Sequence, residues 1–270
     1  MYFVIFRKIS DMKLSHYFLP FLFLLSIGCK TPLKPVSSTE KLYSVKDTTL
    51  SAGTSEIERM LKPYRDSLSG IMNEVIGETS GDLVKEKPGG SLGNLVTDAM
   101  YTVAKKLDTN CLGAICNYGG IRIPEIKKGK ITKGKIFELL PFENELVILE
   151  IKGDVLEQWL NLISESGGWP VLFKRHYRNQ EMDEDQVKTI RLIFKDKILD
   201  HNIQDNHFHT DSVYHIATND YIANGGDNCD FLKDQKRTNS GLLLRDIVIE
   251  EIRRQHVIKP DNQHRIEFIK

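Results

Sequence analysis

The apolar positions of this chain predict helices and strands in irregular alternation from about residue 55 to the C-terminus. The clearest helix is expected over residues 92–107, where apolar side chains recur at i, i+3, i+4 and i+7. Similar spacing predicts a helix that begins near Ser55, a candidate N-cap, another that follows Gly153, and a third over residues 242–254. Strands are expected at residues 72–78, 112–116, 146–151, 187–194, 213–217 and 265–269.

This order lacks the regular strand–helix–strand period of a doubly wound parallel sheet. We therefore expect an α/β fold of the α+β type, in which helices pack a mixed β-sheet in a single domain over residues 55–270. No internal repeat is visible in the sequence. The densely charged segment 174–185 predicts a solvated loop.

The first thirty residues differ from the rest of the chain. An apolar run at residues 18–27 is too short to span a membrane and has the length of a signal-peptide core. It ends in Leu-Ser-Ile-Gly-Cys-Lys at residues 25–30, which resembles a bacterial lipobox, although Ser26 stands where leucine is usual. Residues 1–29 are therefore predicted to be a lipoprotein signal peptide with Cys29 as the lipidated residue; a plain secretory signal is the alternative.

Lipidation at Cys29 would place the protein in the bacterial cell envelope, anchored to a membrane without spanning it. The following residues, 30–54, are rich in Ser, Thr, Pro and Lys and hold few large apolar side chains. This composition predicts a flexible tether.

Charge and cysteine content narrow the possible functions. The 270 residues hold 37 basic and 37 acidic side chains, and this balance argues against a nucleic-acid groove. Apart from Cys29, the odd number of remaining cysteines, Cys111, Cys116 and Cys229, cannot all pair within the chain. Cys111 and Cys116 flank a short apolar strand and are expected to be small buried hydrophobic residues, and no Cys-x-x-Cys or Cys-x-x-His spacing indicates a metal site.

Three loops carry candidate chemistry, and each follows an apolar segment. Asn117-Tyr-Gly-Gly-Ile-Arg122 combines paired glycines with a guanidinium that fits a phosphate or carboxylate. The other two loops, at residues 139–144 and 221–227, present an aromatic ring after a proline and an aromatic ring beside Gly-Gly-Asp. Alone, each loop could be an ordinary turn, and Phe142 could be a core aromatic residue.

Four motifs in this order resemble the C-terminal, substrate-binding domain of the 5'-nucleotidase family, from about residue 57 to the C-terminus. They are Ser91-Leu-Gly-Asn-Leu-Val-Thr-Asp-Ala-Met100, Asn117-Tyr-Gly-Gly-Ile-Arg122, Leu140-Pro-Phe-Glu-Asn144 and Asn219-Asp-Tyr-Ile-Ala-Asn-Gly-Gly-Asp227.

The resemblance implies roles for six residues in binding a nucleotide or nucleoside. Phe142 and Tyr221 would hold the base between two rings, and Asp227 would bind the ribose hydroxyls. Asn117 and Arg122 would lie at the ligand, where Gly120 permits close approach of the backbone. The family usually has an arginine before the Leu-Gly-Asn motif, whereas this chain offers only Lys85 and Lys87 there. A lysine supplies charge without the bidentate geometry of arginine.

The resemblance covers the family's substrate-binding half only. Family members hydrolyse phosphate esters with two metal ions bound by a separate metallophosphatase domain, whose Gly-Asn-His motif does not occur in this chain. One Asp-x-His is present, Asp205-Asn-His207. The only His-x-His, His207-Phe-His209, lies in a polar segment typical of a surface loop. We therefore expect no metal or other cofactor in this chain, and a separately encoded metallophosphatase as partner. A nucleoside-binding lipoprotein without a hydrolytic partner is the alternative.

Overall fold

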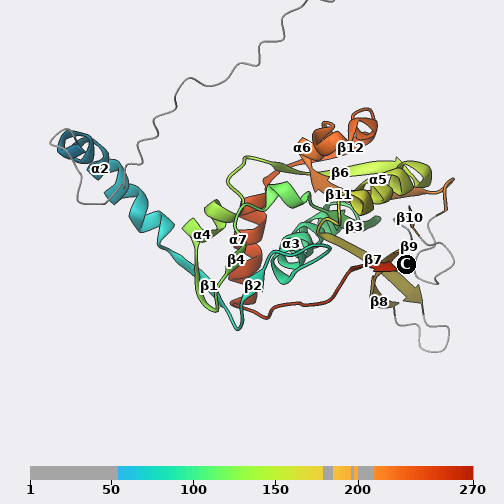
Figure 1. The fold of residues 1–270 in the computed structure, drawn as a ribbon, viewed down its shortest axis with the longest axis horizontal. Coiled ribbons are helices and arrows are strands. Elements are labelled where there is room, and N and C mark those ends of the chain that lie inside the picture. The colour runs from blue at the N-terminus through green and yellow to red at the C-terminus, as the bar shows by residue number, and fades with distance from the viewer. Residues whose placement is uncertain (1–53, 179–184, 196–197, 200–208, 270) are drawn as a thin grey trace, which may run out of the picture. The chain divides into compact units, whose positions relative to one another are not determined.

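The computed structural model of the chain describes residues 54–178, 185–195, 198–199 and 209–269 (Figure 1). The chain divides into two compact units, Met1–Ser55 and Glu56–Lys270, and the second contains nearly all of the described structure. The predicted signal peptide with Cys29, and the predicted tether as far as residue 53, lie outside the described residues.

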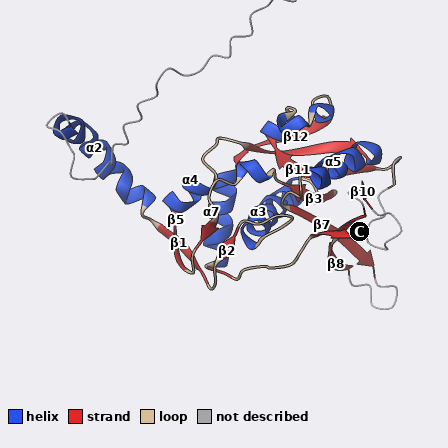
Figure 2. Cartoon of the chain, in the orientation of Figure 1, coloured by secondary structure: helices blue, strands red, loops and turns tan. Residues whose placement is uncertain are grey.

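A six-stranded mixed sheet forms the centre of the second unit (Figure 2). Its strands, in spatial order, are β12 (Lys236–Leu243), β6 (Glu145–Lys152), β11 (Val213–Asn219), β3 (Cys111–Ile115), β7 (Val171–Arg178) and β8 (Asp185–Ile190). Only β11 and β3 run parallel to each other, and every other neighbouring pair is antiparallel. The predicted mixed sheet with α/β content is therefore confirmed.

Both faces of the sheet are buried by helices. The alternation in β6 shows this directly: Leu146 and Ile148 belong to one core cluster, while Val147 and Leu149 belong to the other. The first cluster includes buried residues of α3 (Ser91–Leu107) and α7 (Leu244–Gln255), and the second those of α5 (Gly153–Glu165). The expected core helix over residues 92–107 is thus confirmed as α3.

Smaller sheets and helices surround this centre. The small sheets consist of β13 (Val257–Ile258), β1 (Val75–Thr79) and β5 (Gly129–Thr132); of β10 (Ile198–Leu199), β9 (Leu192–Lys195) and β14 (Ile266–Ile269); and of β2 (Leu83–Val84) and β4 (Glu125–Ile126). The remaining helices are α2 (Thr54–Met72), α4 (Lys133–Leu139) and α6 (Asp220–Ala223), with short 3₁₀ turns at Tyr118–Gly120, Gly226–Asn228 and Asp230–Leu232.

Two predictions about residues 174–194 were wrong. The expected single strand at 187–194 is two strands, β8 and β9, which are separated at Arg191 and belong to different sheets. The charged segment 174–185, expected to be a loop, instead continues β7 as far as Arg178 and begins β8 at Asp185, while its residues 179–184 lie outside the described residues. Backbone hydrogen bonds between β7 and β8 stabilise these strands regardless of side-chain polarity, so the charge pattern did not reveal them.

The buried positions of Cys111 and Cys116 confirm the prediction that they are small buried residues. Trp159 and Trp169 are buried, as are Cys111, Cys116 and Cys229, which are all free thiols. None of the helices among the described residues is long and apolar enough to cross a membrane.

Candidate functional site

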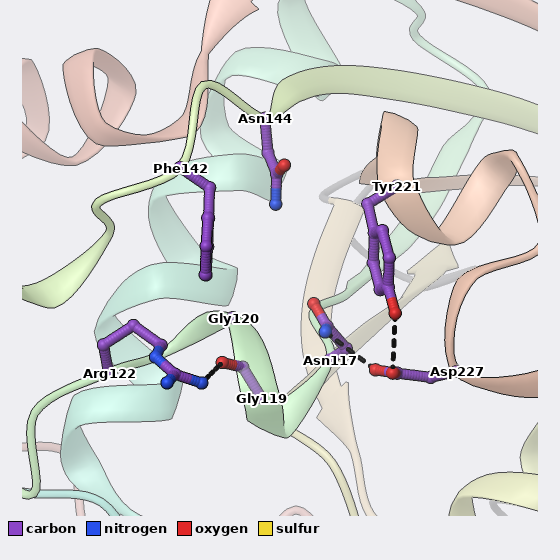
Figure 3. Close-up of a pocket in the computed structure, with 8 residues that line it drawn as sticks. All are labelled: Asn117, Gly119, Gly120, Arg122, Phe142, Asn144, Tyr221 and Asp227. Atoms are coloured by element: carbon purple, nitrogen blue, oxygen red, sulfur yellow. Dashed lines mark hydrogen bonds between the residues drawn. The ribbon is translucent and has the colours of Figure 1, made fainter.

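All three candidate loops meet at one pocket of about 280 Å³ (Figure 3). Its lining contains the six residues singled out in the sequence together with Gly119 and Asn144; the full set is Asn117, Gly119, Gly120, Arg122, Phe142, Asn144, Tyr221 and Asp227. The volume is close to the lower end of the range for small-molecule sites, roughly 300–1,000 Å³.

The strand order explains why loops so distant in sequence converge. β3 and β11 are parallel neighbours, so their carboxyl ends lie at the same edge of the sheet. Asn117 follows β3 closely, and Tyr221 follows β11 on α6. β6 runs antiparallel to β11, so the segment before β6, with Phe142 and Asn144, reaches that same edge. The fold therefore delivers all three loops to one place.

Two exposed aromatic rings stand on opposite sides of the pocket. Phe142 is 48% exposed and Tyr221 is 45% exposed, although both are large aromatic residues. Figure 3 shows the two rings across the cavity from each other, with Asn144 between them at one end. The alternative in which Phe142 is a core residue is therefore wrong.

Asp227 lines the pocket next to Tyr221 and Asn117, and both of its carboxylate oxygens accept a hydrogen bond. Oδ1 accepts a hydrogen bond from the Tyr221 hydroxyl at 3.0 Å, and Oδ2 accepts one from Nδ2 of Asn117 at 2.8 Å. The bond to Asp227 raises the pKa of Tyr221, because it stabilises the protonated hydroxyl. Asp227 has a left-handed backbone conformation (φ 51°), which is uncommon for a residue other than glycine and often marks a functional position.

Asn117 connects the first loop to the third. It is only 4% exposed, and its Oδ1 accepts a hydrogen bond from Nδ2 of Asn219 at 3.0 Å. Asn219 in turn caps α6 by accepting from the backbone N–H of Ile222 at 2.9 Å. A Cβ atom on Gly120 would lie 2.8 Å from Oδ1 of Asn117. Glycine is therefore needed at residue 120 to leave room for this side chain, a reason the sequence did not disclose.

Arg122 supplies positive charge at the pocket. Its Nη1 donates to the Gly119 carbonyl at 3.2 Å, and its guanidinium carbon lies 5.7 Å from the centre of the Phe142 ring. That distance is within the range of a cation–π contact. Its backbone N–H also bonds the Leu139 carbonyl at 2.9 Å, which fixes the first loop against the second.

The two lysines considered as substitutes for the family's arginine do not line the pocket. Lys85 Nζ donates to the Ile121 carbonyl at 2.7 Å and lies 3.8 Å from the centre of the Tyr118 ring. Lys87 Nζ donates to the Ser166 carbonyl at 2.6 Å and lies 4.7 Å from the same ring. Burial and the nearby Arg122 charge lower the pKa of Lys85.

Sequence reasoning missed three contributors to the site. Gly119 and Asn144 line the pocket, and Asn219 orients Asn117 from behind it. All three belong to the motifs quoted above, so the motifs themselves were the available signal. Asn219 could also have been recognised as the N-cap of a helix that follows a strand.

A metal ion needs a set of ligand side chains held close together. Within the described ranges, no group of three or more His, Cys, Asp or Glu side chains could hold a metal ion. His207 lies outside those ranges, and His209 is exposed. The described residues therefore do not fit the two-metal centre that the resemblance implies for a metallophosphatase domain.

Comparisons with known proteins identify relatives of this chain. The chain is 30% identical over 183 residues to the trifunctional nucleotide phosphoesterase protein YfkN of Bacillus subtilis (strain 168), a match that covers 64% of this chain and 12% of YfkN. It is 24% identical over 210 residues to the cell wall protein Lmo0130 of Listeria monocytogenes, covering 68% of this chain and 25% of Lmo0130.

A solved structure shares the fold. The 5'-nucleotidase precursor from Thermus thermophilus matches with a TM-score of 0.61 and 26% identity, covering 80% of this chain and 43% of that one. The chain thus spans less than half the length of these relatives. The family model described as "5'-nucleotidase, C-terminal domain" matches residues 75–234, which hold every residue of the pocket. This chain belongs to the 5'-nucleotidase C-terminal domain family.

Proposed function

We propose that this chain is the nucleotide- and nucleoside-recognition half of a 5'-nucleotidase-type phosphoester hydrolase. In this proposal it is tethered in the bacterial envelope through Cys29 and acts with a separately encoded metallophosphatase. The observation that carries the proposal is the pocket between Phe142 and Tyr221, which Asp227 lines beside Tyr221.

Two facing rings and a carboxylate suit the parts of a nucleoside. The flat faces of Phe142 and Tyr221 offer stacking on both sides of a base, at about 1–3 kcal/mol per stacked base. A carboxylate that is already oriented accepts hydrogen bonds from the paired hydroxyls of a ribose. Because every base has a flat face, stacking alone selects weakly among bases.

Arg122 is the residue best placed for a phosphate. Only one of its guanidinium nitrogens, Nη1, donates to the Gly119 carbonyl, and the residue is exposed. Lys85 and Lys87 hold their ammonium groups against Tyr118 and backbone carbonyls instead. Recognition in this chain would therefore depend on the base and ribose more than on the phosphate.

Separate observations support the proposed metallophosphatase partner and the proposed location in the cell envelope. The described residues hold no metal-binding group, while the hydrolysis of phosphate monoesters in this family uses two metal ions. The lipobox-like sequence ending at Cys29 supports an envelope anchor, and one of the relatives is a cell wall protein.

Calorimetry with adenosine tests recognition. The parent chain should bind with saturation, and Phe142→Ala and Tyr221→Ala should each weaken binding by about tenfold, equivalent to the loss of one stacking face. Tyr64→Ala is the matched control, since Tyr64 is an exposed aromatic residue outside the pocket. The absence of saturable heat from the parent chain would refute the proposal.

Hydrolysis of AMP separates the proposal from its alternative. The purified chain with divalent metal should release no phosphate, and a metallophosphatase that co-purifies with it should restore release. Robust hydrolysis by the chain alone would contradict the proposal that this chain binds the nucleotide and a separate metallophosphatase hydrolyses it. If adenosine binds but no such partner exists in the source cells, the second candidate, a nucleoside-binding lipoprotein, replaces the first.

A further inference from the structure

Helix α2 exposes a continuous apolar stripe that the pocket does not explain. The stripe consists of Ile57, Leu61, Tyr64, Leu68 and Ile71, which follow one another at intervals of four, three, four and three residues. Each of these side chains is between 45% and 68% exposed. The family match begins only at residue 75, after α2 has ended.

An uncovered α2 would be a poor helix. Pro63 lies inside it and cannot donate a backbone hydrogen bond, and its ring crowds the carbonyl of Arg59. The proline divides α2 into two shorter stretches, and isolated helices below about 12–15 residues are marginal in water even without proline. Because most helical stability comes from packing an apolar face, the helix needs a partner surface along its stripe.

The spacing of the stripe fits another helix. Alternating intervals of four and three residues place the five side chains at positions a and d of a heptad repeat, the seam that packs in a coiled coil. Pro63 falls at position c, away from the seam, so its ring does not occupy the contact positions.

The charges on α2 argue against a lipid surface as the occupant. Between residues 56 and 66 the helix carries three acidic and three basic side chains: Glu56, Glu58, Asp66, Arg59, Lys62 and Arg65. Helices that lie on anionic membranes have an excess of basic residues on the polar face.

We propose that α2 pairs in antiparallel orientation with α2 of a second copy of this chain. In the register that sets Leu61 beside Tyr64 of the second copy, Ile57 lies beside Leu68 of the second copy, and two-fold symmetry repeats both contacts. An interface of this kind is self-complementary, as a symmetric dimer requires.

Charge complementarity selects the antiparallel orientation. In that register Glu58 and Arg65 flank the seam at position e, and each faces the opposite charge on the second copy. A parallel pair would instead set Met60 beside Arg65 and Ser67 beside Met72, with no opposite charges. In the single chain Glu58 and Arg65 already form an exposed ion pair of 3.1 Å along the helix, so they can exchange partners.

Sedimentation equilibrium of the full chain in a density-matched mild detergent tests the pairing. The parent chain should be dimeric at micromolar concentration, and Leu61→Asp should raise the dimer dissociation constant at least about tenfold, because it buries a charge in the seam. Lys62→Asp, on the neighbouring outward position, is the matched control and should leave the dimer unchanged.

A charge exchange tests the orientation. Glu58→Arg and Arg65→Glu should each weaken self-association, because each brings like charges together. A mixture of the two variants should associate again, since one chain then carries two positive and the other two negative charges at these positions. A parent chain that stays monomeric, a dimer that survives Leu61→Asp, or a mixture that fails to associate would overturn the proposal.

This inference does not rest on the proposed function, and the two can fail separately. Adenosine calorimetry on the same samples reports the pocket, which should be unaffected by Leu61→Asp, and circular dichroism shows that the variant is folded whether or not adenosine binds. If the parent chain is a monomer and α2 instead binds a metallophosphatase, the self-pairing is refuted while the proposed function stands.

Discussion

Two neighbouring side chains orient the carboxylate of Asp227, the residue proposed to bind the ribose. An ionised carboxylate has about four acceptor positions. The Tyr221 hydroxyl and Nδ2 of Asn117 each use one, on different oxygens, so one position on each oxygen stays available. Two neighbouring acceptors held at fixed orientation match two neighbouring hydroxyls, and the backbone strain at φ 51° is offset by these bonds.

Replacing Asp227→Asn should therefore discriminate between a nucleoside and its base. Asparagine tolerates the left-handed backbone but has one acceptor oxygen and no charge. Adenosine affinity should fall at least about tenfold, because the roughly 1.5–3 kcal/mol of a hydrogen bond to a charged group corresponds to about 13- to 160-fold in affinity, while adenine affinity should hardly change. Calorimetry with both ligands measures the difference.

Asp230→Ala is the control for Asp227→Asn. Asp230 belongs to the next 3₁₀ turn, forms an exposed ion pair with Lys233, and does not line the pocket. It should bind both ligands as the parent chain does. An equal loss of adenosine and adenine in Asp227→Asn would count against the ribose assignment.

The turn that follows α6 can form against the Tyr221 ring only because residue 226 is a glycine. A Cβ atom there would overlap the ring of Tyr221, which lies directly against the backbone of this glycine. Gly225 just before it adopts φ 88°, the left-handed conformation that directs the chain back toward the pocket. The turn and the ring thus fix each other.

Gly226→Ala should consequently disable the pocket without unfolding the domain. The added methyl group displaces the Tyr221 ring, and with it the hydrogen bond to Asp227, so adenosine binding should weaken at least about tenfold, as for loss of a stacking face. The thermal midpoint should change little, because the ring is half exposed. Gly89→Ala, whose Cβ would meet nothing within 4 Å, is the control. Unchanged adenosine affinity in Gly226→Ala would contradict this coupling.

Some helices, strands and loops could be predicted from the sequence, and others could not. α3 was predictable because its apolar face repeats through four turns, and the site loops were recognisable from their motifs. β12 was missed because Lys-Arg-Thr-Asn-Ser-Gly is polar and most of it is exposed at the sheet edge. An edge strand formed by backbone pairing with β6 leaves no apolar alternation to detect.

The predicted start of the helix over residues 242–254 was wrong for a related reason. Leu242 and Leu243 fitted the apolar period of the predicted helix, yet both residues end β12, and α7 begins at Leu244. For α2 the helix was predicted from its apolar spacing, and the apolar side chains that gave this spacing are exposed. The spacing of apolar residues shows that a helix has an apolar face, but it does not show which surface covers that face.

For the whole molecule, the buried thiols link folding to pH. Burial raises the pKa of Cys111 to about 11, and that of Cys116 and Cys229 to about 12. Below pH 9, the ordinary thiol pKa, the thiols are protonated in the folded and unfolded chain alike. Above it the unfolded chain loses these protons while the folded chain keeps them, so stability should fall as the pH rises from 9 toward 11–12.

Urea unfolding at a series of pH values from neutral to strongly alkaline measures this slope. Each thiol that stays protonated only in the folded state contributes at most about 1.4 kcal/mol per pH unit. A chain with Cys111→Ala, Cys116→Ala and Cys229→Ala will start from a lower stability because of small cavities, but its alkaline slope should be shallower. The alkaline slope, and not the stability at neutral pH, is therefore the quantity to compare between the two chains. The native parent chain should also resist alkylation at these three residues until urea unfolds it. Equal alkaline slopes in the two chains would mean that the thiols do not couple folding to pH.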